Sequence, residues 1–215
     1  MKTIASSDWH LPFSNSTVWA LLERAQDASE LVLCGDTYDL MKVPMEEIIG
    51  GGESKQIHDR LRKLAEEITV VIIPGNHDGE LNRYSAQFAP IHIFPQHRSQ
   101  GFKFTHGHEF DLMCRSLPWK VLQFILPKIV RWETPAAIKN VGKPEKYHRL
   151  VGIIHGFALA HLADKKYLKG LVMGHTHLPL KVEMEDSRVL LDVGDRVDSR
   201  SFGIIEDGKA SLERS

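Results

Sequence analysis

The stretch Leu31-Val32-Leu33-Cys34-Gly35-Asp36-Thr37-Tyr38-Asp39 couples a short apolar run to a turn that carries carboxylates. An apolar run that ends at a glycine is typical of a buried strand. Gly35 permits a tight turn, so Asp36 follows at the carboxyl end of the strand, where open α/β sheets place their ligands. Taken alone, the motif is equally consistent with a Gly-Asp turn that caps the next helix.

Similar apolar runs lie on both sides of this stretch. Strands are expected at residues 3–6, 31–34, 68–73, 91–94, 102–105, 171–173, 180–185, 188–192 and 202–206, and helices near 16–28, 45–66 and 81–88. The early alternation of strands and helices requires a parallel sheet, whereas the closely spaced later strands indicate antiparallel pairing. We therefore expect an α/β (α+β) fold in which two mixed sheets and outer helices form a four-layer αββα sandwich.

Residues 114–169 interrupt this pattern, because they contain no good strand and consist of helical patterns separated by prolines. These prolines are Pro118, Pro127, Pro135 and Pro144. We expect residues 1–215 to form a single domain, with a helical cap inserted at about 114–169.

The composition is that of an ordinary soluble globular protein, with 42% apolar and 26% charged residues. A net charge of −1 provides no global basic field for nucleic acid, although a local patch can still bind it. Cys34 and Cys114 form neither a CxxC motif nor a disulfide framework. The N-terminus leads directly into a strand, and no apolar stretch reaches the ~18 residues of a membrane span. We expect a cytoplasmic protein without a signal peptide.

Further polar motifs each follow a predicted strand. They are Asp8-Trp9-His10, Gly75-Asn76-His77-Asp78, Thr105-His106-Gly107-His108 and Gly174-His175-Thr176-His177. Side chains two residues apart point the same way in extended chain, so Asp8 and His10 can converge on one ion. Each motif alone is weak evidence for a metal site, because turns and structural histidines produce similar patterns. Two His-x-His pairs that each follow a strand are not explained in that way.

Together the motifs supply imidazoles, carboxylates and an amide oxygen, but no thiolate. This mixture suits Mn²⁺, Fe or Zn²⁺ and differs from the ligand sets of structural zinc sites. The ligands are too many for one ion, and two metals that share a carboxylate, ~3.5–4 Å apart, serve phosphate-ester hydrolysis. We expect two divalent ions, with manganese preferred and iron, zinc or magnesium as alternatives.

The order of these motifs resembles the signature of the calcineurin-like metallophosphoesterases, from Asp-x-His at Asp8 to the Gly-His-x-His that ends at His177. The resemblance covers most of the chain. It implies a first metal bound by Asp8, His10, Asp36 and His177. It implies a second metal bound by Asp36, Asn76, His106 and His175, with Asp36 as the bridge.

The same resemblance implies a catalytic role for His77, which is expected to face the substrate as an acid or a phosphate contact. Asp39 is expected to orient His77, because an Asp–His pair fixes the tautomer and favours the charged ring. Asn76, His77 and Arg115 are the expected substrate-binding residues. His108 occupies a position that is an acid in many relatives, and we expect it behind the metal ligands.

Two features resemble the branch of this family that hydrolyses the pyrophosphate of UDP-2,3-diacylglucosamine. One is the helical insert. The other is Asp192-Val193-Gly194-Asp195-Arg196-Val197-Asp198-Ser199, which is similar to a Gly-Asp-aromatic-Val-Glu-Ser stretch of those relatives. The chain departs from the branch at His77, where those enzymes often carry Arg. The departure bears on the specific pyrophosphatase activity and leaves a general phosphoesterase activity intact.

The expected function is hydrolysis of a phosphodiester, pyrophosphate or monoester bond by metal-activated hydroxide. Proton donation by His77 to the leaving oxygen contributes ~10²–10⁴-fold in rate. A nuclease or cyclic-nucleotide phosphodiesterase is the alternative on the same site. A catalytically inactive binding module is the alternative outside enzymes.

The insert leaves two interpretations open. Residues 117–132 have a wide apolar face at helical spacing, formed by Trp119, Leu122, Phe124, Ile125, Leu126, Ile129, Val130 and Trp132. A narrow polar stripe is formed by Lys120, Gln123, Lys128 and Arg131. Either the apolar face packs on a second insert helix around Leu150, Ile153, Ile154 and Phe157, or part of it stays open to hold acyl chains or to rest on a membrane surface.

Overall fold

The central strands are apolar at successive positions because both of their faces are buried. In β2 (Glu30–Cys34), Leu31 and Leu33 point into one core, while Val32 and Cys34 point into another. This period of two follows from the pleat of an extended chain.

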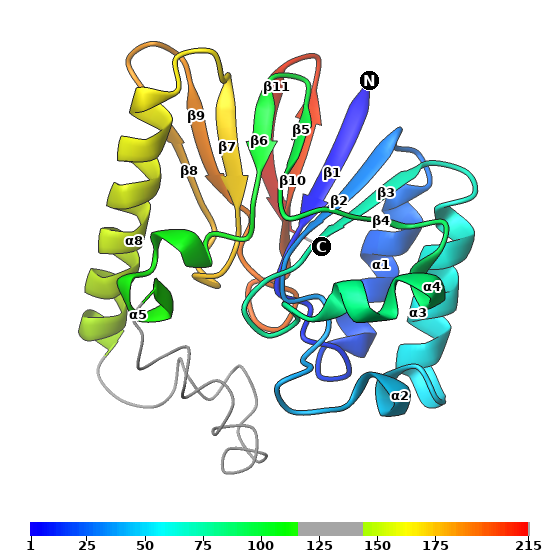
Figure 1. Ribbon diagram of the computed structural model, residues 1–215. Helices are drawn as coiled ribbons and strands as arrows, with labels where there is room; N and C mark the ends of the chain where they lie inside the picture. The colour runs from blue at the N-terminus through cyan, green and yellow to red at the C-terminus, as the bar shows by residue number, and fades with distance from the viewer. Residues whose placement is uncertain (116–143, 215) are drawn as a thin grey trace.

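The structure is a computed structural model, which describes residues 1–115 and 144–214 (Figure 1).

The first sheet has the strand order β11-β10-β1-β2-β3-β4. Its other strands are β1 (Lys2–Ser6), β3 (Thr69–Ile73), β4 (His92–Ile93), β10 (Ser201–Glu206) and β11 (Lys209–Arg214). β1 to β4 are parallel, as crossover helices require, and β10 and β11 are antiparallel. The register places Leu31 of β2 between Ile4 of β1 and Val70 of β3.

The second sheet has the order β5-β6-β7-β9-β8. Its strands are β5 (His97–Ser99), β6 (Phe102–Phe104), β7 (Gly170–Met173), β8 (Leu180–Glu183) and β9 (Val189–Asp192). The expectation of antiparallel later strands is wrong for β6, β7 and β9, which are mutually parallel. The chain reaches β9 through β8, which lies on the far side of β9 and runs antiparallel to it, so β7 and β9 share one direction.

Helices cover the outer faces of both sheets. They are α1 (Asn15–Ala25), α2 (Met45–Ile48), α3 (Gly52–Leu64), the 3-10 helix η1 (Leu81–Tyr84), α4 (Ser85–Phe88), the 3-10 helix η2 (His108–Phe110), α5 (Leu112–Arg115) and α8 (Pro144–Asp164). The single helix expected at 45–66 is split between α2 and α3. Ile49, Gly50 and Gly51 separate them, and Gly52, the first residue of α3, has a φ of +67°. Glycine is among the poorest helix formers, so the break falls there.

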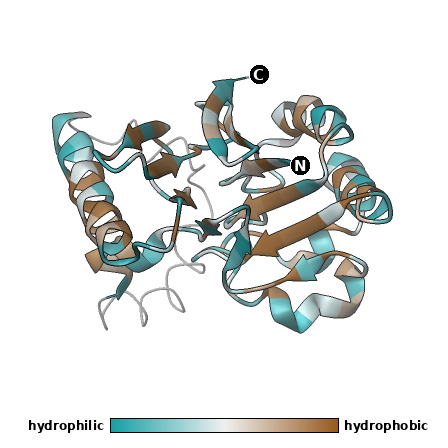
Figure 2. Cartoon of the chain, turned by 90° about the horizontal axis from the view of Figure 1, so that it is seen from above, coloured by the Kyte–Doolittle hydropathy of each residue, from teal (hydrophilic) through white to brown (hydrophobic). Residues whose placement is uncertain are grey.

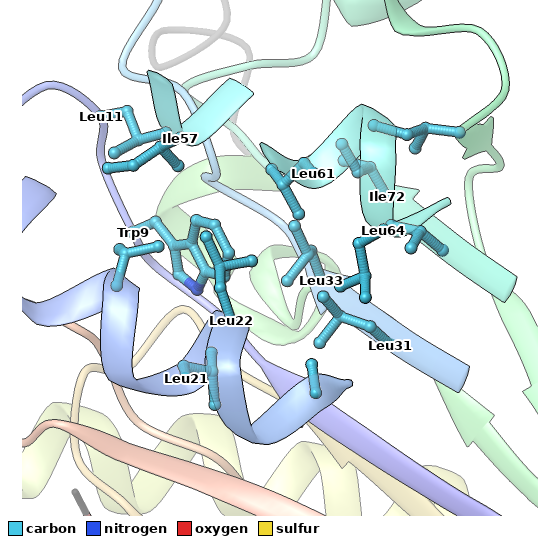
Figure 3. Packing of buried hydrophobic residues seen from close by; sticks show 14 of the residues in the cluster. Trp9, Leu11, Leu21, Leu22, Leu31, Leu33, Ile57, Leu61, Leu64 and Ile72 are labelled. Carbon is cyan, nitrogen blue, oxygen red and sulfur yellow. The ribbon is translucent and has the colours of Figure 1, made fainter. Parts of the chain in front are cut away.

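Three cores separate four layers, which confirms the predicted αββα sandwich. Helices α1 and α3 pack on the first sheet, the two sheets face each other, and α8 packs on the second sheet (Figure 1). The strands of the first sheet are largely hydrophobic in Figure 2, whereas the helices place hydrophilic residues outward. In Figure 3, Leu21 and Leu22 of α1 and Leu61 of α3 gather near the fully buried Trp9.

Two strands and part of the insert differ from the sequence-based expectations. β5 and β11 were not expected, because they are rich in polar residues. The apolar face expected at 117–132 lies outside the described residues. On α8, Ile154 is buried, whereas Leu150, Ile153 and Phe157 are exposed among the residues described. No helix in the described parts of the chain is long and apolar enough to cross a membrane.

Candidate metal centre

The carboxyl ends of the parallel strands of both sheets meet at one end of the sandwich, the lower end in Figure 1. Asp8 and His10 follow β1, Asp36 and Asp39 follow β2, and residues 76–78 follow β3. His106 follows β6, and His175 and His177 follow β7. The topology thus brings together chemistry that is spread over most of the sequence.

Asp8, His10 and His177 form the first cluster. Nε2 of His10 lies 3.6 Å from Oδ1 of Asp8 and 3.8 Å from Oδ2 of Asp36. Nε2 of His177 lies 3.3 Å from the same oxygen of Asp8. These separations exceed ordinary hydrogen bonds. They are close to the roughly 3.0–3.6 Å between neighbouring ligand atoms around a cation with bonds of about 2.0–2.2 Å.

Asp8, Asp36 and His106 form a second cluster. Nε2 of His106 lies 3.4 Å from Oδ2 of Asp36 and 3.1 Å from Oδ1 of Asn76. The Nδ1–H group of His106 donates a hydrogen bond to the carbonyl oxygen of Cys34 at 2.8 Å. That bond fixes the ring so that Nε2 is the atom that faces the acids.

Buried polar atoms without partners indicate that the first cluster fits a cation. Oδ1 of Asp8 and both ring nitrogens of His10 are buried and make no hydrogen bond with the described residues. Such atoms carry a free-energy penalty of about 1–3 kcal/mol each unless a ligand satisfies them. Carboxylate, imidazole and amide donors form the set that borderline and hard divalent ions accept, so the residues fit the metals that the motifs predict.

The backbone at the predicted ligands is unusual. Asp8, His10, Asp36, His175 and His177 have positive φ angles of 53°, 47°, 51°, 71° and 55°. Non-glycine residues rarely adopt this region, and those that do cluster at functional sites. The expectation that Asp8 and His10 converge through extended chain is therefore wrong in its geometry, although their side chains do meet. Trp9 between them points into the core, where its indole N–H donates to Ser6 Oγ at 2.8 Å.

The carboxylates make the site attractive to cations. Burial by itself lowers the pKa of His10, but Asp39, Asp8 and Asp36 outweigh it and raise that pKa to about 10. Burial likewise lowers the pKa of His106, and Asp36 raises it to about 10. The acids therefore stabilise positive charge at both imidazoles, and a bound metal would replace protons as the source of that charge.

Asp39 lies between two imidazoles. Its Oδ1 accepts a hydrogen bond from Nδ1–H of His77 at 2.9 Å, the partner that the sequence predicts. Its Oδ2 lies 3.4 Å from Nδ1 of His10. The rings of His10 and His77 meet edge to face, with centroids 4.8 Å apart. Asp39 can therefore orient a predicted metal ligand as well as the predicted acid.

His175 lies beside the second cluster but faces another direction. Its ring centroid is 5.1 Å from that of His106, and its backbone N–H donates to Oδ2 of Asp8 at 2.8 Å. Its Nε2 atom lies 3.0 Å from Oδ2 of Asp111. The structure thus groups this imidazole with Asp111, which the sequence did not single out, and not with Asp36 and Asn76.

Several supporting carboxylates were also missed. Asp78 accepts backbone N–H groups from Gly75 at 2.6 Å and Thr37 at 2.8 Å, so it ties the loops after β2 and β3 together. Asp195 accepts Nδ1–H of His177 at 2.8 Å. Both acids lie in sequence segments that had been singled out. Their supporting roles depend on burial and on contacts with other loops, which only the folded chain reveals.

The predicted substrate-binding residues do not all lie together. A cavity of about 200 Å³ adjoins the clusters, and its lining includes Asn76 and His77 but not Arg115. Arg115 is exposed and lines a different hollow with Lys103 and Glu109. His108 lies behind the clusters, its ring centroid 5.3 Å from that of His106. Burial, followed by the charge of His106, lowers the pKa of His108 to about 4.

Comparisons with known proteins agree with this fold. A model of the calcineurin-like phosphoesterase family matches residues 1–179. UDP-2,3-diacylglucosamine hydrolase of Shewanella piezotolerans is 23% identical over 237 residues, which cover 99% of this chain and 97% of that protein. A solved archaeal phosphodiesterase has a TM-score of 0.53 at 15% identity and covers 99% of both chains. A metallophosphoesterase from Sphaerobacter thermophilus has a TM-score of 0.50 at 14% identity, over 100% of this chain and 88% of that one.

The two-sheet fold, the acid and imidazole clusters and these relatives define a metal-dependent phosphoric ester hydrolase. The chain belongs to the calcineurin-like phosphoesterase family, whose model matches most of its length. The predicted resemblance to the UDP-2,3-diacylglucosamine branch is confirmed by the curated relative.

Proposed function

We propose that the protein hydrolyses a phosphodiester or pyrophosphate bond in a substrate that carries an apolar group, with two divalent cations as cofactors. Asp8, His10, Asp36 and His177 are the proposed ligands of one cation, and Asp36, Asn76, His106 and His175 of the other. Bound divalent cations neutralise the phosphate charge and lower the pKa of bound water. Manganese is the proposed native metal, and a monoester is the alternative substrate.

His77 is the proposed acid. Its Nδ1–H group is held by Asp39 at 2.9 Å, so Nε2 is the nitrogen left to carry a second proton. The side chain is partly exposed and lines the cavity, which suits contact with a leaving oxygen. Donation of this proton helps most when the leaving group is a poor one.

The composition of the cavity wall carries the proposal about the substrate. Asp36, Asn76 and His77 provide a polar floor. The lining also includes apolar residues, which are Met113, Leu150, Val151 and Ile154. An amphipathic phosphoester places its phosphate on such a floor and its apolar part against such residues. The name of the curated relative, UDP-2,3-diacylglucosamine hydrolase, supports the same class of substrate.

Leu150→Asp tests this assignment against a matched control. Leu150 lines the cavity, whereas Ile153 on the same helix does not, and both are exposed, at 38% and 46%. With Mn²⁺, Leu150→Asp should lower kcat/KM for a lipid-tailed phosphoester about tenfold or more, since each buried CH₂ contributes ~0.8 kcal/mol. Ile153→Asp should behave like the wild type, and a small nitrophenyl diester should be hydrolysed equally by all three proteins.

Other results would point elsewhere. Equal losses on both substrates would mean that Leu150 supports the site and not an apolar group. Preferred turnover of single-stranded DNA or of a cyclic nucleotide would favour a nuclease or cyclic-nucleotide phosphodiesterase. Absence of turnover on every ester, with metals bound, would favour a binding module.

A further inference from the structure

A cysteine lies beside His175, a proposed ligand of the second cation. Sγ of Cys114 is 3.9 Å from Nε2 of His175 and 3.7 Å from Oδ2 of Asp111. The same Oδ2 atom is 3.0 Å from Nε2 of His175. One potential ligand atom from each of the three side chains therefore lies within 4 Å of the other two.

Local structure holds this triad in place. Asp111 and Cys114 are three residues apart at the start of α5, where such a spacing puts side chains on one face. Oδ1 of Asp111 accepts the backbone N–H of Met113 at 2.8 Å, which leaves Oδ2 to face His175. The backbone of His175 is fixed by its N–H bond to Asp8.

The three distances suit a tetrahedral zinc ion. Zinc bonds of about 2.3 Å to sulfur and 2.0–2.1 Å to nitrogen or oxygen put neighbouring ligand atoms roughly 3.3–3.5 Å apart. The observed distances of 3.0, 3.7 and 3.9 Å bracket that range. Three protein ligands leave the fourth position of a tetrahedral ion to solvent from the cavity.

The chemistry of this triad differs from that of the two clusters. The clusters offer oxygen and nitrogen only, whereas the triad adds sulfur, and thiolate ligands select zinc over manganese or magnesium. We propose that Asp111, Cys114 and His175 form an additional site for a thiophilic divalent cation such as Zn²⁺. This proposal goes beyond the hydrolytic function and does not require it.

Occupation of the triad has a consequence for catalysis that does rest on the proposed function. His175 is a proposed ligand of the second catalytic metal, and its Nε2 atom faces Asp111 in the triad. All three residues of the triad also line the cavity proposed for the substrate. Zinc at the triad therefore occupies part of that cavity, perturbs a proposed ligand of the second catalytic metal and inhibits the enzyme.

Cobalt spectroscopy of the full-length, metal-free protein tests the site without measuring activity. Co²⁺ occupies zinc sites, and a thiolate ligand gives it a near-ultraviolet charge-transfer band that oxygen and nitrogen ligands do not give. The wild type should show the band and Cys114→Ser should lose it. Cys34→Ala is the matched control and should keep the band, because the Cys34 side chain is fully buried in the core between the two sheets. A wild type without the band, or a Cys114→Ser variant that keeps it, would overturn the proposal.

Zinc inhibition of the Mn²⁺-loaded enzyme tests the consequence. Each variant is compared with its own rate before zinc is added. The zinc concentration for half inhibition should rise about tenfold or more in Cys114→Ser, because loss of even an outer-shell partner lowers metal affinity 10–100-fold. Equal inhibition of both proteins would show that zinc acts at the catalytic pair. If the chain hydrolyses no ester at all, the cobalt band still decides whether the site exists.

Discussion

The hydroxyl of Thr176 donates a hydrogen bond of 2.7 Å to Oδ2 of Asp192. The same oxygen accepts a bond of 2.9 Å from Nε2 of His155 on α8, and Tyr147 of that helix donates to the Thr176 carbonyl. Thr176 stands between His175 and His177, whose positive φ angles cost ~1–3 kcal/mol each unless the surroundings hold them. Helix α8 therefore braces the turn that carries two proposed metal ligands.

Loss of this brace should loosen metal binding. Thr176→Val removes the hydroxyl at nearly constant volume, and Thr176→Ser retains it. We expect Thr176→Val to lower Mn²⁺ affinity ~10–100-fold, as loss of outer-shell partners does, and Thr176→Ser to stay near the wild type. Calorimetric titration of the metal-free proteins measures this. Unchanged affinity in Thr176→Val would show that the turn needs no brace.

His77 and Asp39 should differ in their effects because Asp39 faces two rings. His77→Asn should leave metal content near normal and lower kcat ~10²–10⁴-fold for esters with poor leaving groups. The loss should shrink for nitrophenolate, which departs without a proton. Asp39→Asn should also weaken metal binding, since Oδ2 of Asp39 lies 3.4 Å from Nδ1 of His10. Equal losses of His77→Asn on both leaving groups would argue against an acid.

Sequence patterns predicted the layers of the fold better than its later topology. Leu31 to Cys34 indicated a buried strand, and the structure places a core on each side of it. The direction of β9 was not predictable from spacing alone, because the chain passes through β8 first. β11 was missed because Lys209, Glu213 and Arg214 give an edge strand a polar composition.

Sequence patterns likewise predicted only part of the candidate site. Asp8, His10, Asp36 and His106 stand in short motifs, so their neighbourhood could be inferred from strand ends. Asp111 comes five residues after His106 and approaches His175 only through the turn at Gly107, which has a φ of 110°. His155 reaches Asp192, the last residue of β9, from α8, which packs on the second sheet. Such partners depend on tertiary packing, which no local pattern encodes.

Glu30 should contribute pH-dependent stability at the other end of the sandwich. It is buried and accepts hydrogen bonds from His97 and Thr3, at 2.7 and 2.9 Å. Burial alone raises the pKa of Glu30, but bonds from His97, Ser99 and Thr3 outweigh it and hold the pKa below its usual 4.5. A carboxyl with a lowered folded pKa stabilises above its unfolded pKa, and this stabilisation is lost as the pH falls through the folded value.

Urea unfolding of Glu30→Gln measures that contribution. Near neutral pH, the variant should be less stable than the wild type by about 1.5–3 kcal/mol, the range for hydrogen bonds to a charged group. The difference should shrink as the pH falls below about 4.5, where the unfolded carboxyl takes up its proton. A difference that stays constant as the pH falls further below that value would show that the charge of Glu30 does not stabilise the fold.

The metal stoichiometry of the wild type and of Asp36→Ala tests the central claim most directly. Oδ2 of Asp36 lies 3.8 Å from Nε2 of His10 and 3.4 Å from Nε2 of His106, between the two clusters. Elemental analysis after Mn²⁺ loading and dialysis should give about two ions per chain for the wild type. Asp36→Ala should lose ions from both positions, and its turnover should disappear. One tightly held ion in the wild type, together with an active Asp36→Ala variant, would contradict a metal pair bridged by Asp36.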